Sequence, residues 1–210
     1  MSTPKAALRQ ALRAARRSLS PEEHRDRSRR ASAALGRLPE FRAGRRVAVY
    51  LPFDAEVDTA LLLAAGRRRG VELHVPVIGD RRHRRLKFCP LEGRMRRGTF
   101  GISVPRRVVR SVGARWFHLI VVPVVGIDAG GRRLGMGLGF YDRVTAFRRV
   151  RTRWCGPRLA GLAFDLQCVE SIGAEPWDLR LDVTATESGL RRHRVPPIEE
   201  SINESIEESS

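Results

Sequence analysis

The chain has 210 residues and a hydrophobic content of 42%, which excludes wholesale disorder and is enough for a core without a metal or disulfide to stabilise it. Its longest apolar run, residues 118–126, is about half the length that a membrane-spanning helix needs. The formal net charge of +17 would suit an anionic partner such as RNA or a polyphosphate, but it comes almost entirely from arginines, a bias that a GC-rich coding sequence would give without any such partner.

Helical spacing and capping residues predict four helices. Pro4 begins the first, and a Ser-Pro-Glu-Glu capping box at 20–23 begins the second. The apolar stripe of the first helix is expected to consist of Leu8, Leu12, Ala15 and Leu19. The later helices are expected at 21 to about 36, about 58 to 69 (ended by Gly70), and about 140 to 150.

Short runs of apolar and β-branched residues between these helices predict six strands, at 47–52, 71–78, 86–91, 118–125, 158–164 and 181–187. The run at 118–125 is the most apolar and suits the centre of a parallel sheet, and the run at 86–91 suits a place near an edge. Residues 79–85 are expected to form a basic loop, 98–105 a loop with an extended piece, and 126–139 a glycine-rich segment.

This alternation of strands and helices predicts an α/β class: a layered α/β/α domain with a largely parallel central sheet. We expect residues 1–195 to form that single domain. Residues 196–210 contain five glutamates and few apolar side chains, and are expected to be an acidic, disordered tail.

The cysteines Cys89, Cys155 and Cys168 are widely spaced and form no CxxC motif or zinc-like cluster with the scattered histidines. We interpret them as reduced thiols in a reducing compartment. Because the basic N-terminus also lacks the apolar core of a secretory signal, a cytoplasmic location is expected.

Glycine-rich residues 133–142 (RLGMGLGFYD) lie between the most apolar strand and a helix. Gly135, Gly137 and Gly139 alternate there, so several backbone N–H groups are accessible, as in a phosphate-binding loop. The segment is neither the dinucleotide fingerprint nor a Walker loop. A tight glycine turn without a ligand is the alternative, and the spacing alone does not separate the two.

Five charged residues could act with this loop. Lys5 and Arg9 share a helix face and could reach one polyphosphate. Glu56 lies just beyond a predicted strand, where a carboxylate could accept hydrogen bonds from a ring or an amide. Asp142 and Asp178 are carboxylates of the kind that bind Mg²⁺ beside phosphate. Each has a simpler alternative: a solvated basic pair, a loop carboxylate, or a favourable charge in the first turn of a helix.

Taken in order, these segments resemble the 5-formyltetrahydrofolate cyclo-ligase family, also called methenyltetrahydrofolate synthetases, from Lys5 to about Glu187. The most specific match is LIVVPVVGIDAGGRRLGMGLGFYDR at 119–143. The other matches are KAALRQALRAARRSLSPEE at 5–23, LPFDAEVDT at 51–59 and EPWDLRLDVTATE at 175–187.

The resemblance implies an ATP-dependent ligase. ATP would phosphorylate the formyl oxygen of 5-formyltetrahydrofolate, the second bridging nitrogen would close the ring, and 5,10-methenyltetrahydrofolate, ADP and phosphate would leave. The implied partners are ATP, 5-formyltetrahydrofolate with or without a polyglutamate tail, and Mg²⁺ as cofactor, with no specific nucleic acid, no membrane and a monomeric enzyme.

By the same resemblance, the site residues fall into three sets. The ATP-binding set is Lys5, Arg9, Arg133, Leu134, Gly135, Met136, Gly137, Leu138, Gly139, Phe140 and Tyr141. The substrate-binding set is Leu51, Glu56, Met136, Gly137, Leu138, Gly139 and Phe140. The magnesium positions are Asp142 and Asp178.

One position in the glycine-rich loop departs from the family. Where relatives commonly carry glycine or lysine, this chain has Leu138, so charge at the transferring phosphoryl group must come from Arg133 or magnesium. Leucine disfavours positive φ, so Leu138 is expected in an ordinary backbone region between two strained glycines.

The alternative function is a basic anion- or nucleic-acid-binding module without turnover. All but two of the 40 basic residues are arginines, and they are spread along the whole chain. A nucleic-acid module would instead show a basic stripe with interleaved aromatic residues.

Overall fold

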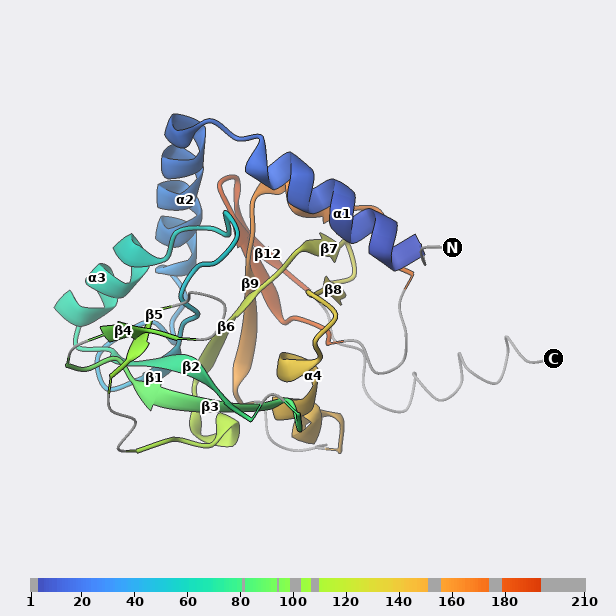
Figure 1. Cartoon of the computed structure of the whole chain (residues 1–210). Coiled ribbons are helices and arrows are strands. Elements are labelled where there is room, and N and C mark those ends of the chain that lie inside the picture. Colours follow the sequence, from blue (N-terminus) through green and yellow to red (C-terminus); the bar gives the residue numbers. More distant parts are fainter. Residues whose placement is uncertain are drawn as a thin grey trace.

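The computed structural model (Figure 1) describes residues 4–80, 82–93, 95–98, 103–106, 110–150, 156–173 and 179–193. Within these residues a seven-stranded sheet lies at the centre, in the order β12-β11-β9-β6-β1-β2-β3. Its strands are β1 (Arg46–Ala48), β2 (Glu72–Asp80), β3 (Arg85–Pro90), β6 (Leu119–Pro123), β9 (Arg158–Leu162), β11 (Val183–Thr186) and β12 (Gly189–Arg192).

The inner part of this sheet is parallel: β2, β1, β6, β9 and β11 pair in parallel, while β3 and β12 pair antiparallel with β2 and β11 at the two edges. The predicted largely parallel sheet is therefore confirmed. The most apolar run also occupies the expected place, because β6 is the middle strand.

Side chains of β6 alternate between two hydrophobic clusters on opposite faces of the sheet. Leu119 and Val121 join the cluster formed with α2 (Pro21–Leu35) and α3 (Ala60–Arg68). Ile120 and Val122 join the cluster that contains Phe88 and Phe117. Because both faces are buried, the strand reads as a continuous apolar run.

The helices cover the sheet unevenly. α2 and α3 lie together on one face (Figure 1). The other face is covered by α4 (Phe140–Val144) and by 3₁₀ turns at Ala114–Trp116 and Ala146–Val150. The layered α/β arrangement is thus as predicted, with a thinner layer on the second face.

α1 (Pro4–Arg17) lies beside the two short strands β7 (Gly126–Asp128) and β8 (Arg133–Leu134) (Figure 1). Its Leu12 packs against Val125 and Leu134. A Cβ added to Gly126 would come within 2.6 Å of Leu12, closer than real Cβ contacts allow, so glycine at 126 lets the helix approach this closely.

Three further short strands complete the described structure. β10 (Cys168–Val169) joins β7 and β8 in a small sheet in the order β10-β7-β8. β4 (Met95–Arg97) pairs antiparallel with β5 (Ser103–Pro105), and a last 3₁₀ turn spans Asp165–Gln167. The glycine-rich stretch 126–139 therefore contains two strands that its sequence did not predict.

The helix starts agree with prediction, and α2 has the predicted capping box: the Ser20 hydroxyl accepts from the Glu23 N–H, and the Glu23 carboxylate accepts from the Ser20 N–H. The predicted stripe of α1 is wrong at Ala15, which is exposed, whereas Arg16 is buried. Arg16 follows Leu12 by four residues, and it is buried because it finds an anionic partner.

Three other predicted boundaries need correction. β1 ends at Ala48 rather than near residue 52, because the chain there turns away toward a left-handed pair of residues at 54 and 55. β2 and β3 continue their antiparallel pairing to Asp80 and Arg85, which shortens the predicted basic loop. α4 ends at Val144, where the Thr145 hydroxyl donates to the Tyr141 carbonyl at 2.7 Å and a 3₁₀ turn follows.

Candidate active site

A cavity of about 770 Å³ opens at the carboxyl ends of the central strands. From β1 the sheet is built outward in two opposite directions. The chain first adds β2 on one side of β1, and later adds β6 on the other side, followed by β9 and β11. Ligands of open α/β sheets bind at such a switch point. The lining residues are Lys5, Arg9, Tyr50, Leu51, Phe53, Glu56, Pro76, Ile78, Arg84, Leu86, 123–125, 133–143 and Ala146.

α1 supplies one wall of this cavity. Lys5 and Arg9, one helical turn apart, both line it. The Nε atom of Arg9 donates to the carbonyl of Gly135 at 2.8 Å, which ties the helix to the glycine-rich loop. Two cationic side chains therefore stand beside that loop.

Glu56 also lines the cavity, from the turn that follows β1. It is 8% exposed, and its Oε2 atom accepts from the Phe53 N–H at 3.0 Å. Burial raises the pKa of Glu56 to about 7, because the hydrogen bond from Phe53 and the charge of Arg16 offset only part of the desolvation. Near neutral pH this carboxyl can therefore exist in either protonation state.

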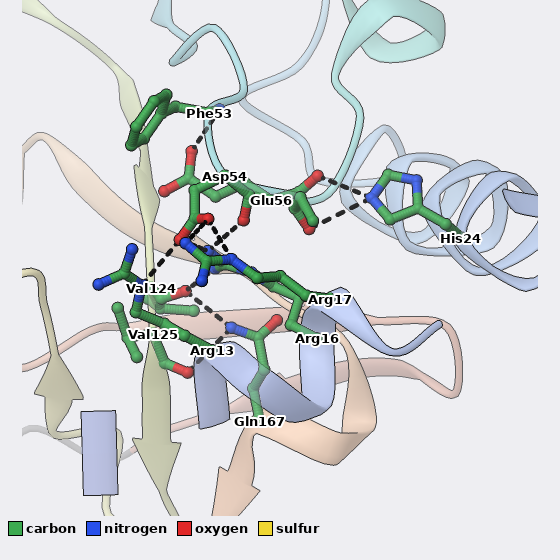
Figure 2. Close-up of polar contacts among 11 residues, drawn as sticks. Arg13, Arg16, Arg17, His24, Phe53, Asp54, Glu56, Val124, Val125 and Gln167 are labelled. Carbon is green, nitrogen blue, oxygen red and sulfur yellow. Dashed lines mark hydrogen bonds and ion pairs between the residues drawn. The ribbon is translucent and has the colours of Figure 1, made fainter. Parts of the chain in front are cut away.

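The same turn contains Asp54, whose carboxylate lies among three arginines of α1 (Figure 2). Burial alone would raise the pKa of Asp54, but hydrogen bonds from Arg13 and Arg17 outweigh it and hold that pKa below its ordinary value. Asp54 is therefore an anion that fixes the turn against α1.

The glycine-rich loop has the backbone predicted for it. Gly137 and Gly139 take φ values of +84° and +67°, a region that L-residues rarely adopt, whereas Leu138 between them has an ordinary backbone conformation. The side chains of Met136 and Leu138 are 37% and 45% exposed at the cavity. The strained angles therefore fall on glycines.

Arg133 and Asp142 form an ion pair at the floor of the loop, with Arg133 Nη2 3.3 Å from Asp142 Oδ2. Arg133 Nη1 donates to the Pro123 carbonyl at 3.1 Å, and its guanidinium lies 5.6 Å from the centre of the Tyr141 ring. Its buried Nε has no hydrogen-bond partner among the described residues. Arg133 is thus a fixed cation inside the cavity.

Asp142 suits one part of the predicted magnesium site. Its side chain is 29% exposed and lines the cavity. In nucleotide sites Mg²⁺ takes one or two protein carboxylates and completes its shell with phosphates and water, so a carboxylate beside this loop fits such an ion. The other predicted ligand, Asp178, lies outside the described residues, among which no cluster of three or more metal-ligating side chains is found.

All the other predicted site residues line this one cavity. They come from three separate parts of the chain: α1, the turn after β1, and residues 133–142, which span β8, the glycine-rich loop and the start of α4. Lys5, Glu56 and Gly137 are more than 50 residues apart in sequence, yet they surround the same space.

Sequence reasoning missed two parts of the site. The wall formed by Pro76, Ile78 and Leu86 comes from the β2–β3 hairpin, and Arg84 projects from its tip. The interaction of Asp54 with α1 was also missed, because nothing in an arginine-rich helix sequence indicates which arginine will be buried. The three arginines within residues 13–17 were the only sequence signal for an anionic partner there.

The described cysteines are Cys89, which is buried, and Cys168, which is half-buried; both are free, and burial raises the pKa of each thiol. Cys155 lies outside the described residues. None of the helices in the described part of the chain has the length and apolar character to cross a membrane.

Comparisons with known proteins identify the family of this chain. The model of the 5-formyltetrahydrofolate cyclo-ligase family matches residues 1–187. The 5-formyltetrahydrofolate cyclo-ligase of Escherichia coli K12 is 31% identical over 181 residues, covering 84% of this chain and 97% of that protein. That of Mycolicibacterium smegmatis is 32% identical over 187 residues, covering 84% and 90%.

Solved structures give the same result. The NMR structure of Aquifex aeolicus 5,10-methenyltetrahydrofolate synthetase superposes with a TM-score of 0.77 at 31% identity, covering 91% of this chain and 94% of that one. The family model spans all four segments that carried the resemblance. The chain therefore belongs to the 5-formyltetrahydrofolate cyclo-ligase family.

Proposed function

We propose that this protein is an ATP-dependent ligase that converts 5-formyltetrahydrofolate to 5,10-methenyltetrahydrofolate, with release of ADP and phosphate. The observation that carries the proposal is the convergence, on one cavity, of cationic groups, an alternating-glycine loop and a buried carboxyl. Family membership supplies the reaction, and the cavity supplies a place for both substrates.

In this reaction the formyl oxygen attacks the γ-phosphorus of ATP, and the bond to ADP breaks. The second bridging nitrogen of the folate then attacks the activated formyl carbon and loses its proton. This attack closes the ring, and departure of phosphate then leaves the carbon–nitrogen double bond of the methenyl product. Such chemistry depends mainly on alignment of the two substrates and on stabilisation of phosphoryl charge.

The phosphate end of the cavity is assigned to Lys5, Arg9 and Arg133 together with the loop from Leu134 to Tyr141. Its cations approach from α1 on one side and from the loop floor on the other. These cations supply the positive charge that a lysine at position 138 would give and that Leu138 does not. Arg133 is suited to this role because contacts with Pro123 and Asp142 hold it in place.

The folate end is assigned to Leu51 and Glu56, with Met136 to Phe140 bordering both substrates. A buried carboxylate is a strong acceptor for the N–H groups of a pterin ring, and Glu56 has one oxygen held by Phe53. The exposed apolar side chains of Met136 and Leu138 offer a surface for a flat ring.

Magnesium belongs to the same proposal. Asp142, with Asp178 as second ligand, would hold the ion next to the ATP phosphates, where it would neutralise charge on the phosphate oxygens. Arg133 holds the Asp142 carboxylate at the cavity wall.

We further propose a monomeric, cytoplasmic enzyme whose catalytic domain comprises residues 1–195, with the acidic tail at 196–210 outside it. The net charge of +17 suits a substrate with a polyglutamate tail, because an anionic chain is attracted to a basic surface.

The direct test is turnover. The protein is mixed with 5-formyltetrahydrofolate, ATP and Mg²⁺, and methenyltetrahydrofolate absorbance, ADP and phosphate are measured together, with the enzyme-free rate subtracted. We expect equal amounts of the three products and none of them when ATP is omitted. Product formation without ATP, or no product at all, would contradict the proposal.

A further inference from the structure

The turn between Leu51 and Glu56 has an unusual backbone. Asp54 and Ala55 have φ values of +55° and +56°, two consecutive non-glycine residues in the left-handed region. Such a conformation persists only where surrounding contacts hold it. On one side, His24 of α2 places Nε2 3.2 Å from the Ala55 carbonyl and 3.1 Å from the Glu56 carbonyl.

On the other side, α1 holds the turn through Asp54 (Figure 2). Asp54 Oδ2 accepts from Arg13 Nε at 2.7 Å and from Arg16 Nη2 at 3.2 Å, and Oδ1 accepts from Arg17. Arg16 Nη2 also donates to the backbone carbonyl of Asp54 at 2.6 Å. The side chains of Asp54 and Arg16 are 7% and 1% exposed, so this pair is buried, whereas Arg13 and Arg17 reach Asp54 from the surface.

Arg16 also reaches the end of the central strand. Its Nη1 lies 3.4 Å from the Val124 carbonyl, which accepts a second hydrogen bond from Gln167 Nε2 at 2.8 Å. Arg16 therefore bridges the segments that follow β1 and β6, the two strands at the switch point. Both segments line the cavity.

The other end of α1 carries the proposed phosphate ligands. Lys5, Arg9, Arg13 and Arg16 recur at intervals of three or four residues and so share one face of the helix. One short helix thus contacts the glycine-rich loop through Arg9 and the Glu56 turn through Asp54.

We propose that Asp54 is a positioning residue for the reaction: by binding Arg13, Arg16 and Arg17 it fixes the Glu56 turn relative to α1, and so aligns bound folate with bound ATP. The inference rests on the proposed function, since it concerns the alignment of those two substrates. Asp54 itself touches neither substrate in this account.

Loss of this anchor should reduce kcat more than it raises either KM. Each half of the cavity keeps its own ligands, so each substrate still binds, but the distance between formyl oxygen and γ-phosphate is no longer fixed. Misplacement of reacting atoms by about 1 Å can cost on the order of a hundredfold in rate.

The test is Asp54→Asn. Asparagine tolerates the left-handed backbone, so the substitution removes the charge and leaves the turn possible. We expect kcat to fall at least about tenfold, with both KM values within about threefold of wild type. The control is Asp26→Asn, an aspartate of α2 that also pairs with arginines, Arg29 and Arg30, but lies exposed on the helix surface.

A pH profile tests whether Asp54 acts on the Glu56 carboxyl. Arg16, Asp54 and Arg133 are the charged groups that act on Glu56, with Tyr50 and Tyr141 nearby. Removal of the Asp54 charge leaves two cations facing that carboxyl, so the acid limb of folate kcat/KM should move to lower pH. An acid limb that stays at its wild-type pH in the folded variant would contradict the coupling of Asp54 to Glu56, and with it the inference.

If Asp54→Asn does not fold, variants of Arg17 test the inference instead. The Arg17 side chain is 54% exposed, so its replacement should leave the fold intact. Arg17→Ala should lower kcat and Arg17→Lys should restore most of it. Unchanged kcat in the variants that fold, or a loss expressed in KM alone, would overturn the inference. Absence of turnover in the wild-type protein would instead contradict the proposed function, and the inference with it.

Discussion

Glu56 is the residue at which burial and function conflict most. Its carboxyl is 8% exposed and has one hydrogen bond from Phe53, and the nearby cations do not fully compensate the desolvation. In the proposed function, this unfavourable desolvation of Glu56 accompanies its use as a hydrogen-bond acceptor for the pterin. Two predictions follow from the pKa of about 7.

The first concerns activity against pH. Glu56 accepts N–H groups only when ionised, so kcat/KM for 5-formyltetrahydrofolate should fall as the pH drops below about 7. In Glu56→Gln the efficiency should be lower, by about 1–3 kcal/mol in transition-state terms, and this acid limb should disappear. Persistence of the same limb in the glutamine variant would assign it to another group.

The second concerns stability. The folded-state pKa of Glu56 is raised from 4.5 to about 7, so this group lowers the free energy of unfolding progressively between those pH values and by its full amount above them. Glu56→Gln should therefore stabilise the protein by up to about 3 kcal/mol at pH 8 and by almost nothing at pH 4. Urea unfolding at both pH values measures this, with the exposed Glu22→Gln as control. A variant less stable than wild type at pH 8 would contradict it.

At the scale of elements, a hydrogen bond from Arg9 to the Gly135 carbonyl joins α1 to the glycine-rich loop. The loop depends on its backbone angles, because glycine carries each positive φ. At Gly137 a Cβ would meet Arg9 only at 3.7 Å, an ordinary contact. Substitution there would therefore act through backbone strain rather than through a clash.

We predict that Gly137→Val and Gly139→Val each lose at least about a hundredfold in turnover while remaining folded, because strain of about 1–3 kcal/mol displaces the loop. Leu138→Gly should keep most of its activity with a modest change in ATP affinity. Turnover, ATP titration and circular dichroism of the three variants measure this. Wild-type turnover in the valine variants would make the loop a structural turn.

Elements with a local signal could be predicted from the sequence. Two examples are the capping box at Ser20 and Glu23 and the apolar run of β6. In each, a pattern within a few neighbouring residues is enough to predict the element. β7 and β8 could not be predicted, because strands of two or three residues carry no periodicity. Arg16 is similar: its partner Asp54 lies 38 residues away, and only the fold brings them together.

The site was predictable to a different degree. The family-like segments located Lys5, Glu56 and the glycine-rich loop, because each contains a chemically distinctive residue type. The cavity wall formed by Ile78 and Leu86 of the β2–β3 hairpin could not be predicted. In a sequence, apolar side chains that line a cavity cannot be distinguished from apolar side chains of the core.

At the scale of the whole molecule, the charge of +17 has no matching nucleic-acid module in the sequence. We predict that any binding of RNA or DNA is weak, independent of sequence and lost steeply between low and physiological salt, as for non-specific phosphate contacts. Fluorescence anisotropy with oligonucleotides of different sequence measures this. A sequence-selective complex that persists at about 150 mM salt would favour the nucleic-acid-binding alternative.

The central claim is that one cavity holds folate at its Glu56 side and ATP at its α1 side. Steady-state kinetics of Glu56→Gln and Arg9→Ala, with both substrates varied, tests it most directly. We predict that Glu56→Gln impairs the use of 5-formyltetrahydrofolate more than that of ATP, and that Arg9→Ala raises the KM for ATP more than that for folate. Wild-type constants for both substrates in both variants would contradict the account.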